Sequence, residues 1–204
     1  KDGKKNGLYK EWYENGQLWE EINYTNGSWN GLYKKWTKNG ELLSEKNYIK
    51  GREARSKEWY KNGQLKNEYN YITGIYPSDT KKDGIQRSWY ENGQLKTESN
   101  YKDGKGNGPF KKWYENGQSE FEINYKDGKK NGLYKEWYEN GQLRSEGNLK
   151  DGKENGLYKE WYENGQLQKE WNYKNDKRNG TCKYYYENGQ LKWHGNFING
   201  WREK

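Results

Sequence analysis

The sequence predicts an all-β fold, an elongated single-layer antiparallel meander of about eight β-hairpin repeats of 23–24 residues each. Three observations predict this fold. An Asn-Gly dipeptide recurs at a nearly constant interval, aromatic residues take the place of aliphatic ones, and charged residues recur at fixed distances from each Asn-Gly. The interval decides the architecture, because a repeat of 20–50 residues indicates an array of stacked supersecondary units.

The recurring dipeptide usually lies within the sequence Trp-Tyr-Glu-Asn-Gly-Gln-Leu. Its glycines are residues 16, 40, 63, 93, 117, 141, 165 and 189, which gives steps of 24, 23, 30, 24, 24, 24 and 24. A second motif, Asp-Gly-Lys-Lys-Asn-Gly-Leu-Tyr or a variant of it, occupies 2–9, 103–110, 127–134 and 151–158. We interpret residues 1–204 as one repeat array. The step of 30 predicts an insertion at Ile75–Asp83 that protrudes as a loop outside the sheet.

Each unit reads as two short strands joined by Asn-Gly. This dipeptide is preferred in two-residue type I′ turns, in which both central residues take a positive φ. In the first unit, such a turn predicts the cross-strand pairs Glu14 with Gln17, Tyr13 with Leu18, Trp12 with Trp19, Lys10 with Glu21, and Leu8 with Asn23.

The same register, applied to every unit, aligns two charged columns. The basic column is Lys10, Lys34, Lys57, Arg87, Lys111, Lys135, Lys159 and Lys183. Its predicted partners are Glu21, Glu45, Glu68, Glu98, Glu122, Glu146, Glu170 and His194. Seven of these eight pairs have opposite charge. The agreement supports the register, because a slip of one residue would place the two columns on opposite faces.

The two faces of the predicted sheet carry different side chains. One carries the charged columns, an Asn column from Asn23 to Asn196 and a Trp column that begins at Trp12. The other carries the Tyr that follows each Trp, the Leu that is expected to oppose it, and a Tyr, Leu or Phe column from Tyr24 to Phe197. The Asn column is expected to bind backbone groups at the longer turn.

Composition excludes most enzyme chemistry. Only 28% of the residues are hydrophobic, so the 12 Trp and 21 Tyr must supply the buried surface. A single His (His194) and a single Cys (Cys182) exclude a His/Cys zinc site, a Ser-His-Asp triad and an internal disulfide. The Glu residues recur in equivalent settings, unlike the paired carboxylates of glycosidases. We therefore expect no catalytic, cofactor-binding or metal-binding residues and no cofactor.

Hairpins of 23–24 residues with Trp, Tyr and Asn-Gly at fixed offsets, separated by Asp-Gly-Lys-Lys-Asn-Gly, resemble MORN repeats. The resemblance covers about residues 1–200 and is closest to the bacterial MORN-variant group known as YwqK-family antitoxins. It implies an elongated antiparallel sheet without catalytic machinery. It also implies protein–protein contacts, or contacts with anionic phospholipids, as the function. The chain departs from the usual unit in having Asn-Gly where His-Gly is common, and it contains no kinase-like sequence.

The sequence therefore predicts a non-catalytic scaffold that binds another macromolecule. We expect a protein partner, with toxin neutralisation or a surface or secreted interaction as the two concrete roles. The most regular units provide the expected partner-binding face, which consists of Trp113, Trp137, Trp161, Lys111, Lys135, Lys159, Glu122, Glu146 and Glu170. Packing of the Trp rings on one another is the alternative interpretation of the Trp column.

Other partners remain open at this stage. A basic edge that carries Lys4-Lys5, Lys81-Lys82, Lys129-Lys130 and Lys177-Arg178 could meet an anionic membrane surface. Repeats of similar length rich in Trp and Tyr also bind choline or glucans. Here the Lys beside each Trp would repel choline and tolerate a sugar, so a glycan is an alternative ligand.

No nucleic-acid module is recognisable, and no nucleic acid is expected. Unpaired edge strands would favour end-to-end self-association. The localisation stays open between the bacterial cytoplasm and export to the cell surface.

Overall fold

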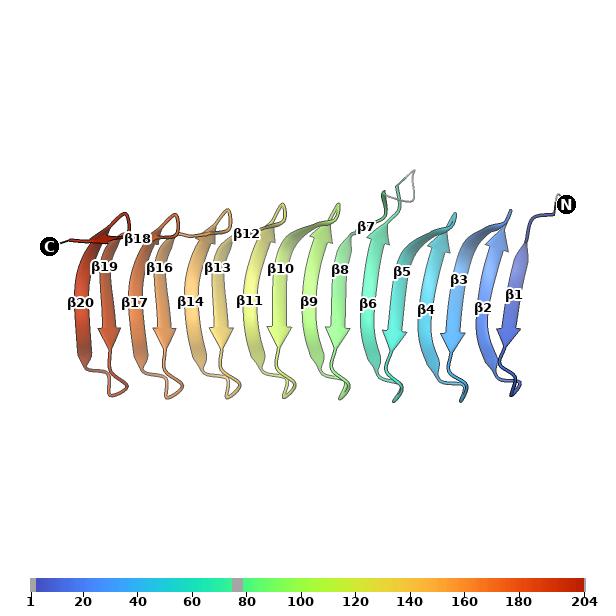
Figure 1. The fold of residues 1–204 in the computed structure, drawn as a ribbon, viewed down its shortest axis with the longest axis horizontal. Coiled ribbons are helices and arrows are strands. Elements are labelled where there is room, and N and C mark those ends of the chain that lie inside the picture. Colours follow the sequence, from blue (N-terminus) through green and yellow to red (C-terminus); the bar gives the residue numbers. More distant parts are fainter. Residues whose placement is uncertain (1–2, 75–78, 204) are drawn as a thin grey trace. The chain divides into compact units, whose positions relative to one another are not determined.

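The computed structural model describes residues 3–74 and 79–203. The chain divides into two compact units, Lys1–Lys105 and Gly106–Lys204, and each contains four of the repeats. Figure 1 shows each unit as a run of antiparallel strands. The predicted all-β meander of hairpin repeats is confirmed within each unit.

In the first unit, consecutive strands pair along the chain. These strands are β1 (Gly7–Trp12), β2 (Leu18–Thr25), β3 (Ser28–Trp36), β4 (Leu42–Ile49), β5 (Arg52–Trp59), β6 (Leu65–Ile72), β8 (Gly84–Trp89) and β9 (Leu95–Lys102). The short strand β7 (Lys81–Lys82) pairs with the end of β6.

The second unit repeats this arrangement. Its long strands are β10 (Lys105–Trp113, which begins at the boundary), β11 (Ser119–Lys126), β13 (Gly132–Trp137), β14 (Leu143–Lys150), β16 (Gly156–Trp161), β17 (Leu167–Lys174), β19 (Gly180–Tyr185) and β20 (Leu191–Ile198). Four two-residue strands pair with the preceding long strand, namely β12 (Lys129–Lys130), β15 (Lys153–Glu154), β18 (Lys177–Arg178) and β21 (Trp201–Arg202).

The Asn-Gly turn differs from the predicted type I′ turn. In the first hairpin, the Gly16 N–H donates to the Tyr13 carbonyl at 2.9 Å, and the Tyr13 N–H donates to the Gln17 carbonyl at 2.8 Å. Gly16 has a φ of 81°, whereas Asn15 is not among the residues with positive φ. This geometry is a type I turn followed by a glycine in a G1 bulge. Asn15 accepts the Gln17 N–H through Oδ1, which fixes the turn without a positive φ.

The type I′ turn lies at the opposite edge of the sheet. Asp127 and Gly128 both have positive φ, at 51° and 83°, as do Asp103 and Gly104 and Asp151 and Gly152. Asp tolerates this region because its short polar side chain can bond locally, and Gly has no Cβ to clash. The predicted type I′ turn is therefore wrong for the recurring Asn-Gly dipeptide, and the turns of that type lie at the Asp-Gly motif, for which no turn type was predicted.

The pairing register is correct away from the turn and wrong next to it. Lys10 pairs with Glu21 and Leu8 with Asn23, as predicted, but Trp12 pairs with Leu18 because a bulge interrupts the ladder beside it. The glycine bulge shifts the pairing by one residue, and this second bulge restores it. The predicted pairs Glu14–Gln17, Tyr13–Leu18 and Trp12–Trp19 are therefore wrong. All eight predicted pairs between the charged columns are confirmed.

The register defines two surfaces. The ladder face carries the columns of Leu8, Lys10, Trp12, Glu21 and Asn23. The aromatic face carries the columns of Tyr9, Glu11, Glu20, Ile22 and Tyr24. The Leu of each Gln-Leu pairs with the Trp, so it lies on the ladder face rather than opposite the Tyr as predicted.

The core lies on the aromatic face. Ile123, Tyr134 and Leu149 form a buried cluster, against which Phe110, Phe121, Tyr125 and Tyr158 pack. Ile22, Cys182 and Phe197 are buried on the same face of other repeats. Aromatic rings in edge-to-face contact continue this packing, as between Trp171 and Tyr184 and between Tyr184 and Trp193. A thin sheet is thus covered on one side by its own rings.

The predicted insertion Ile75–Asp83 is only partly described. Residues 75–78 lie outside the described residues. Lys81 and Lys82 form β7 and pair with Ile72 and Tyr71, and the Asp83 N–H donates to the Asn70 carbonyl at 3.0 Å. The sheet therefore resumes at Lys81, earlier than the prediction of a loop through Asp83.

Candidate functional site

The nine predicted partner-binding residues lie together on the ladder face of the second unit. Strands β10 to β17 place Lys111, Glu122, Lys135, Glu146, Lys159 and Glu170 opposite one another in order. Trp113, Trp137 and Trp161 end β10, β13 and β16, two residues after the corresponding Lys. All nine side chains are partly exposed.

The charged residues form an alternating ladder rather than isolated pairs. Within hairpins, the Lys111 Nζ atom lies 3.5 Å from a Glu122 oxygen, and the Lys159 Nζ atom lies 3.8 Å from a Glu170 oxygen. Between hairpins, Glu170 also accepts from Lys183 at 3.3 Å. Each carboxylate thus stands between two cations. Exposed pairs contribute roughly 0.2–1 kcal/mol each, so the ladder fixes the register more than it stabilises the sheet.

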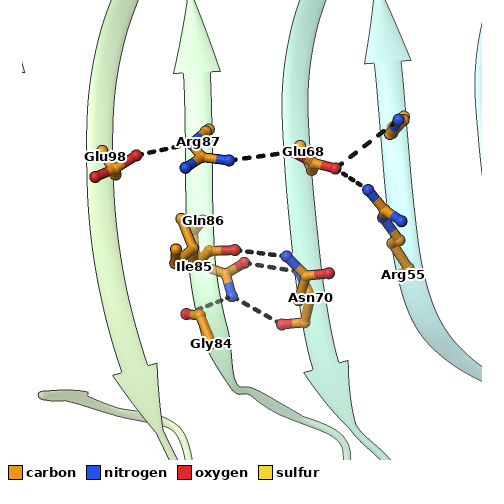
Figure 2. A network of polar contacts seen from close by, with 9 residues as sticks. Arg55, Glu68, Asn70, Gly84, Ile85, Gln86, Arg87 and Glu98 are labelled. Carbon is orange, nitrogen blue, oxygen red and sulfur yellow. Dashed lines mark hydrogen bonds and ion pairs between the residues drawn. The ribbon is translucent and has the colours of Figure 1, made fainter.

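Figure 2 shows the same alternation in the first unit, where Glu68 lies between Arg87 and Arg55 and Arg87 continues to Glu98. The Nε atom of Arg87 lies 2.7 Å from Glu98. Both carboxylates therefore form ion pairs with cations of neighbouring strands.

An apolar column that the sequence reasoning did not single out runs beside the charged ladder. Leu133 and Leu157 are 53% and 43% exposed, and they pair with Asn148 and Asn172 on the ladder face. Pro109 occupies the equivalent position in β10 and is also exposed. The position two residues before each Lys is apolar in most units, and this signal was available in the sequence.

A shallow cavity of about 350 Å³ opens on this face. Trp137 and Leu133 supply apolar walls, and Lys111, Lys135 and Glu122 line it as well. An apolar hollow with a charged surround is the usual anatomy of a protein interface, because apolar anchors supply affinity and charges supply orientation.

The basic edge is arranged differently from the prediction. The first residue of each basic pair is exposed. The second residues, Lys5, Lys82, Lys130 and Arg178, lie over rings of the aromatic face, although of these only Arg178 is partly buried. The Arg178 guanidinium carbon lies 4.1 Å from the centre of the Trp171 ring. These cations cover the core through cation–π contacts. About half of the expected basic edge is therefore engaged with rings of its own or of the preceding repeat.

Exposed lysines still gather at that edge of the second unit. Lys126 pairs with Lys129, Lys150 with Lys153, and Lys174 with Lys177, each pair flanking a type I′ turn or its equivalent. Like charges placed directly opposite each other destabilise a sheet. The pairs thus concentrate positive charge at a cost in stability.

Hydrogen bonds from side chains join one repeat to the next. The Tyr114 hydroxyl donates to the Trp137 carbonyl at 2.7 Å, and the Tyr138 hydroxyl donates to the Trp161 carbonyl at 2.8 Å. At the Asn-Gly turns, the Asn116 amide donates to the Glu139 carbonyl at 2.9 Å. The Tyr and the Asn of the Trp-Tyr-Glu-Asn-Gly motif therefore join neighbouring repeats. The Asn column also binds backbone, as expected, for example from Asn148 to the Asn155 carbonyl.

The titratable groups of the core serve packing. Burial and the hydrogen bond to Glu154 raise the pKa of Tyr134 far above its usual value near 10. Burial likewise raises the pKa of the Cys182 thiol, which is fully buried. His194 pairs with Lys183 in the charged ladder, as predicted. In residues 3–74 and 79–203 there is no cluster of three or more His, Cys, Asp or Glu side chains suited to a metal ion. The same ranges hold no helix long and apolar enough to cross a membrane.

A family model described as the MORN repeat variant matches the chain eight times. The matched residues are 5–26, 29–50, 52–72, 82–103, 107–127, 130–151, 154–175 and 178–199. The chain belongs to the MORN repeat variant family. Each match spans one Asn-Gly turn with its two strands, so the family unit coincides with the hairpin of the structure. A search of curated proteins returned no match.

Membership of the MORN repeat family confirms the resemblance based on Trp-Tyr-Glu-Asn-Gly. MORN repeats are binding and scaffold repeats, and the architecture is typical of non-catalytic proteins. The family does not by itself identify the partner, so the choice of partner rests on the chemistry of the surfaces.

Proposed function

We propose that this chain is a non-catalytic MORN-type scaffold that binds another protein through the ladder face of its second unit. The observation that supports the proposal is that two apolar columns flank the charged ladder. One is the Trp column that contains Trp137, and the other is the column of exposed Leu133 and Leu157. An extended protein segment with apolar side chains on one side and alternating charges matches this surface.

The ladder alternates in sign, and Lys111, Lys159 and Lys183 form ion pairs with its carboxylates. A partner therefore has to match the charge order rather than neutralise a single sign. Mismatched charges would cost several kcal/mol at such an interface. The ladder therefore supplies specificity, and the Trp and Leu side chains supply affinity. A small toxin and a surface or secreted protein are the two partner types we propose.

A second candidate function rests on the exposed lysine pairs, which favour an anionic phospholipid surface. A glycan ligand is the other alternative, and it is supported by the Trp and Tyr rings that pack against one another on the aromatic face. These candidates use other parts of the unit than the ladder face.

A comparative capture experiment tests the proposal. The wild-type chain and the triple variant Trp113→Ala, Trp137→Ala, Trp161→Ala would be used as baits, with Trp12→Ala as the matched control. Trp12 occupies the same column in the first unit and is 58% exposed. We expect one protein to be retained by the wild type and the control and lost from the triple variant. Equal retention by all three baits, or binding only to anionic vesicles or a glycan array, would reject it.

A further inference from the structure

The aromatic face of the first unit contains a basic hollow that the partner-binding function does not use. It has a volume of about 350 Å³ and lies over β6, β8 and β9. Its lining includes Lys66, Lys82 and Lys96 together with the hydroxyl residues Ser88 and Thr97. Among the described residues that line it, none is acidic.

The hollow exists because one hairpin lacks the large side chains of its neighbours. In β8 and β9, the aromatic face carries Gln86, Ser88, Thr97 and Ser99. In β10 and β11, the same positions carry Phe110, Lys112, Phe121 and Ile123, which fill the surface. Short polar side chains in place of rings leave both the space and the unoccupied hydrogen-bonding capacity.

The polar groups at the base of the hollow differ in what they can offer. Gln86 is 3% exposed and is fully engaged, since Nε2 donates to the Asn70 carbonyl at 2.8 Å and Oε1 accepts the Asn70 N–H at 3.1 Å (Figure 2). Ser88 Oγ and Thr97 Oγ1 are 2.6 Å apart, so one hydroxyl donates to the other. Two hydroxyls contain two hydrogens, and their mutual bond uses one, which leaves one donor for a ligand.

The three lysines are held by rings rather than by carboxylates. Lys66 Nζ lies 5.4 Å from the centre of the Tyr60 ring, Lys96 Nζ lies 5.1 Å from that of Tyr90, and Lys82 Nζ lies 5.4 Å from that of Tyr69. The bulge residue of the hairpin is Lys in both adjacent repeats, which places Lys66 and Lys96 at the same hollow. Arg87 also lines the hollow, but its guanidinium is bound by Glu98 and Glu68.

A comparable hollow in the second unit has both basic and acidic side chains in its lining. It has a volume of about 230 Å³ and is lined by Lys112 and Arg144 together with Glu120 and Glu136. Lys112 Nζ is 2.5 Å from Glu120. Its charges are balanced by this unit's own side chains. In the first unit, Lys66 and Ser88 take the positions of Glu120 and Glu136, so the two carboxylates are absent from the lining. Glu58 takes the position of Lys112 and accepts from the Asn67 amide at 2.9 Å.

We propose that this hollow binds a phosphate monoester of a small polyhydroxylated molecule. Three ammonium groups match a dianion, the free hydroxyl hydrogen matches a phosphate oxygen, and Tyr60 and Tyr69 offer ring surfaces beside which a sugar can lie. The site lies on a different face and in a different unit from the partner-binding face, so its presence does not depend on that function.

Titration of the whole chain with glucose 6-phosphate, followed by heteronuclear NMR, tests the assignment. Saturable binding is expected with the wild type, and at least tenfold weaker binding with Lys66→Gln/Lys96→Gln. The variant Ser88→Ala/Thr97→Ala keeps every lysine and should also weaken binding. Lys192→Gln is the matched control, because Lys192 has the equivalent bulge position above Tyr186 in the last hairpin and should leave binding unchanged.

Further arms distinguish the sources of the phosphate group. Vesicles containing phosphatidic acid present the same monoester on a lipid, and binding to them with the same variant pattern would assign the lipid as the source. Glucose alone should not bind. No saturable binding of either monoester by the wild type would overturn the proposal, and so would equal losses in Lys192→Gln and in Lys66→Gln/Lys96→Gln.

Discussion

At the scale of single residues, one side chain in each turn serves two purposes. Asn116 closes its own turn by accepting the Gln118 N–H at 2.9 Å and joins the next repeat by donating to the Glu139 carbonyl at 2.9 Å. Neither function requires the positive φ that the dipeptide Asn-Gly suggests. The repeated Asn is therefore explained by the coupling of repeats as well as by turn formation.

Replacement of this Asn measures the coupling. Asn116→Ala should lower the free energy of unfolding by about 1–2 kcal/mol, because it removes two hydrogen bonds of about 1 kcal/mol each. Asn188→Ala is the control, since Asn188 makes the same bond to the Gln190 N–H in the turn of the eighth hairpin, and no further turn of this kind follows it among the described residues. It should cost about half as much in urea unfolding. Equal losses in the two variants would show that the bond between repeats contributes nothing.

The buried Tyr134 makes stability sensitive to alkaline pH. Burial and the bond to Glu154 raise its pKa in the folded state above the unfolded value near 10. Below pH 10 both states hold the proton, so this stabilisation is fully present. As pH rises above 10, only the unfolded state loses the proton, and stability should fall by up to about 1.4 kcal/mol per pH unit for this residue.

Urea unfolding between pH 9 and 11 of the wild type and of Tyr134→Phe tests this sign. The variant should be less stable at pH 9, because Glu154 loses its hydrogen-bond donor, but its stability should fall less steeply above pH 10. The lysines titrate in both proteins, so the comparison removes their contribution. Parallel slopes would contradict a raised pKa for Tyr134.

At the scale of elements, the sequence predicts the strands and the charged columns but not the turns beside them. The charge columns were sufficient for the register because Lys10 and Glu21 recur as a pair in nearly every unit. The turn type was wrong because Asn-Gly suits both a type I′ turn and a type I turn with a G1 bulge. The second bulge, beside Trp12, restores the register, and no residue type marks it.

As with the strands and turns, only part of the candidate site was predicted from the sequence. The Trp and the charged residues lie on one face, as predicted, since pairing with Glu122 fixes the orientation of Lys111. That this face binds a partner stays a prediction. The exposed Leu133 and Leu157 and the basic hollow at Ser88 were missed. The hollow depends on the absence of rings in one hairpin, which becomes visible only when the columns are compared across repeats.

The two edge turns should respond differently to the same change. Asp127 has a φ of 51°, in the left-handed region. Asp127→Ala should lower the free energy of unfolding by about 1 kcal/mol, because Ala lacks the polar side chain that lets Asp bond locally in this conformation. Glu139 precedes the Asn-Gly of the next turn and is not among the residues with positive φ. Glu139→Ala should change stability by less than about 0.5 kcal/mol. Equal effects in thermal unfolding would refute the assignment of the turn types.

At the scale of the whole molecule, the repeats of each unit are joined to their neighbours in sequence. The pairing runs from hairpin to hairpin, and the Tyr138 hydroxyl reaches only the next repeat. Stability should therefore approximate a sum of repeat terms and neighbour terms. The protein should tolerate a change in the number of hairpins better than a change within one.

Removal of one full period tests this organisation. Deletion of residues 130–153 removes 24 residues, and it should leave a folded β protein with a slightly lower melting temperature. Deletion of residues 130–141 removes a single strand with its turn, which would reverse the direction of every later strand. Circular dichroism should show a cooperative transition for the first variant and its loss for the second. A folded half-period variant, or an unfolded full-period variant, would contradict the neighbour model.

The central claim is that the Trp and Leu columns beside the charged ladder bind a protein. The most direct measurement is a calorimetric titration of the captured partner with folded Trp137→Ala, alongside Trp12→Ala as the control. An anchoring Trp137 predicts a loss of about 2 kcal/mol or more, roughly a thirtyfold rise in Kd, with no change for Trp12→Ala. An unchanged Kd for Trp137→Ala, in protein shown to be folded, would contradict the claim and leave Trp137 as a packing residue.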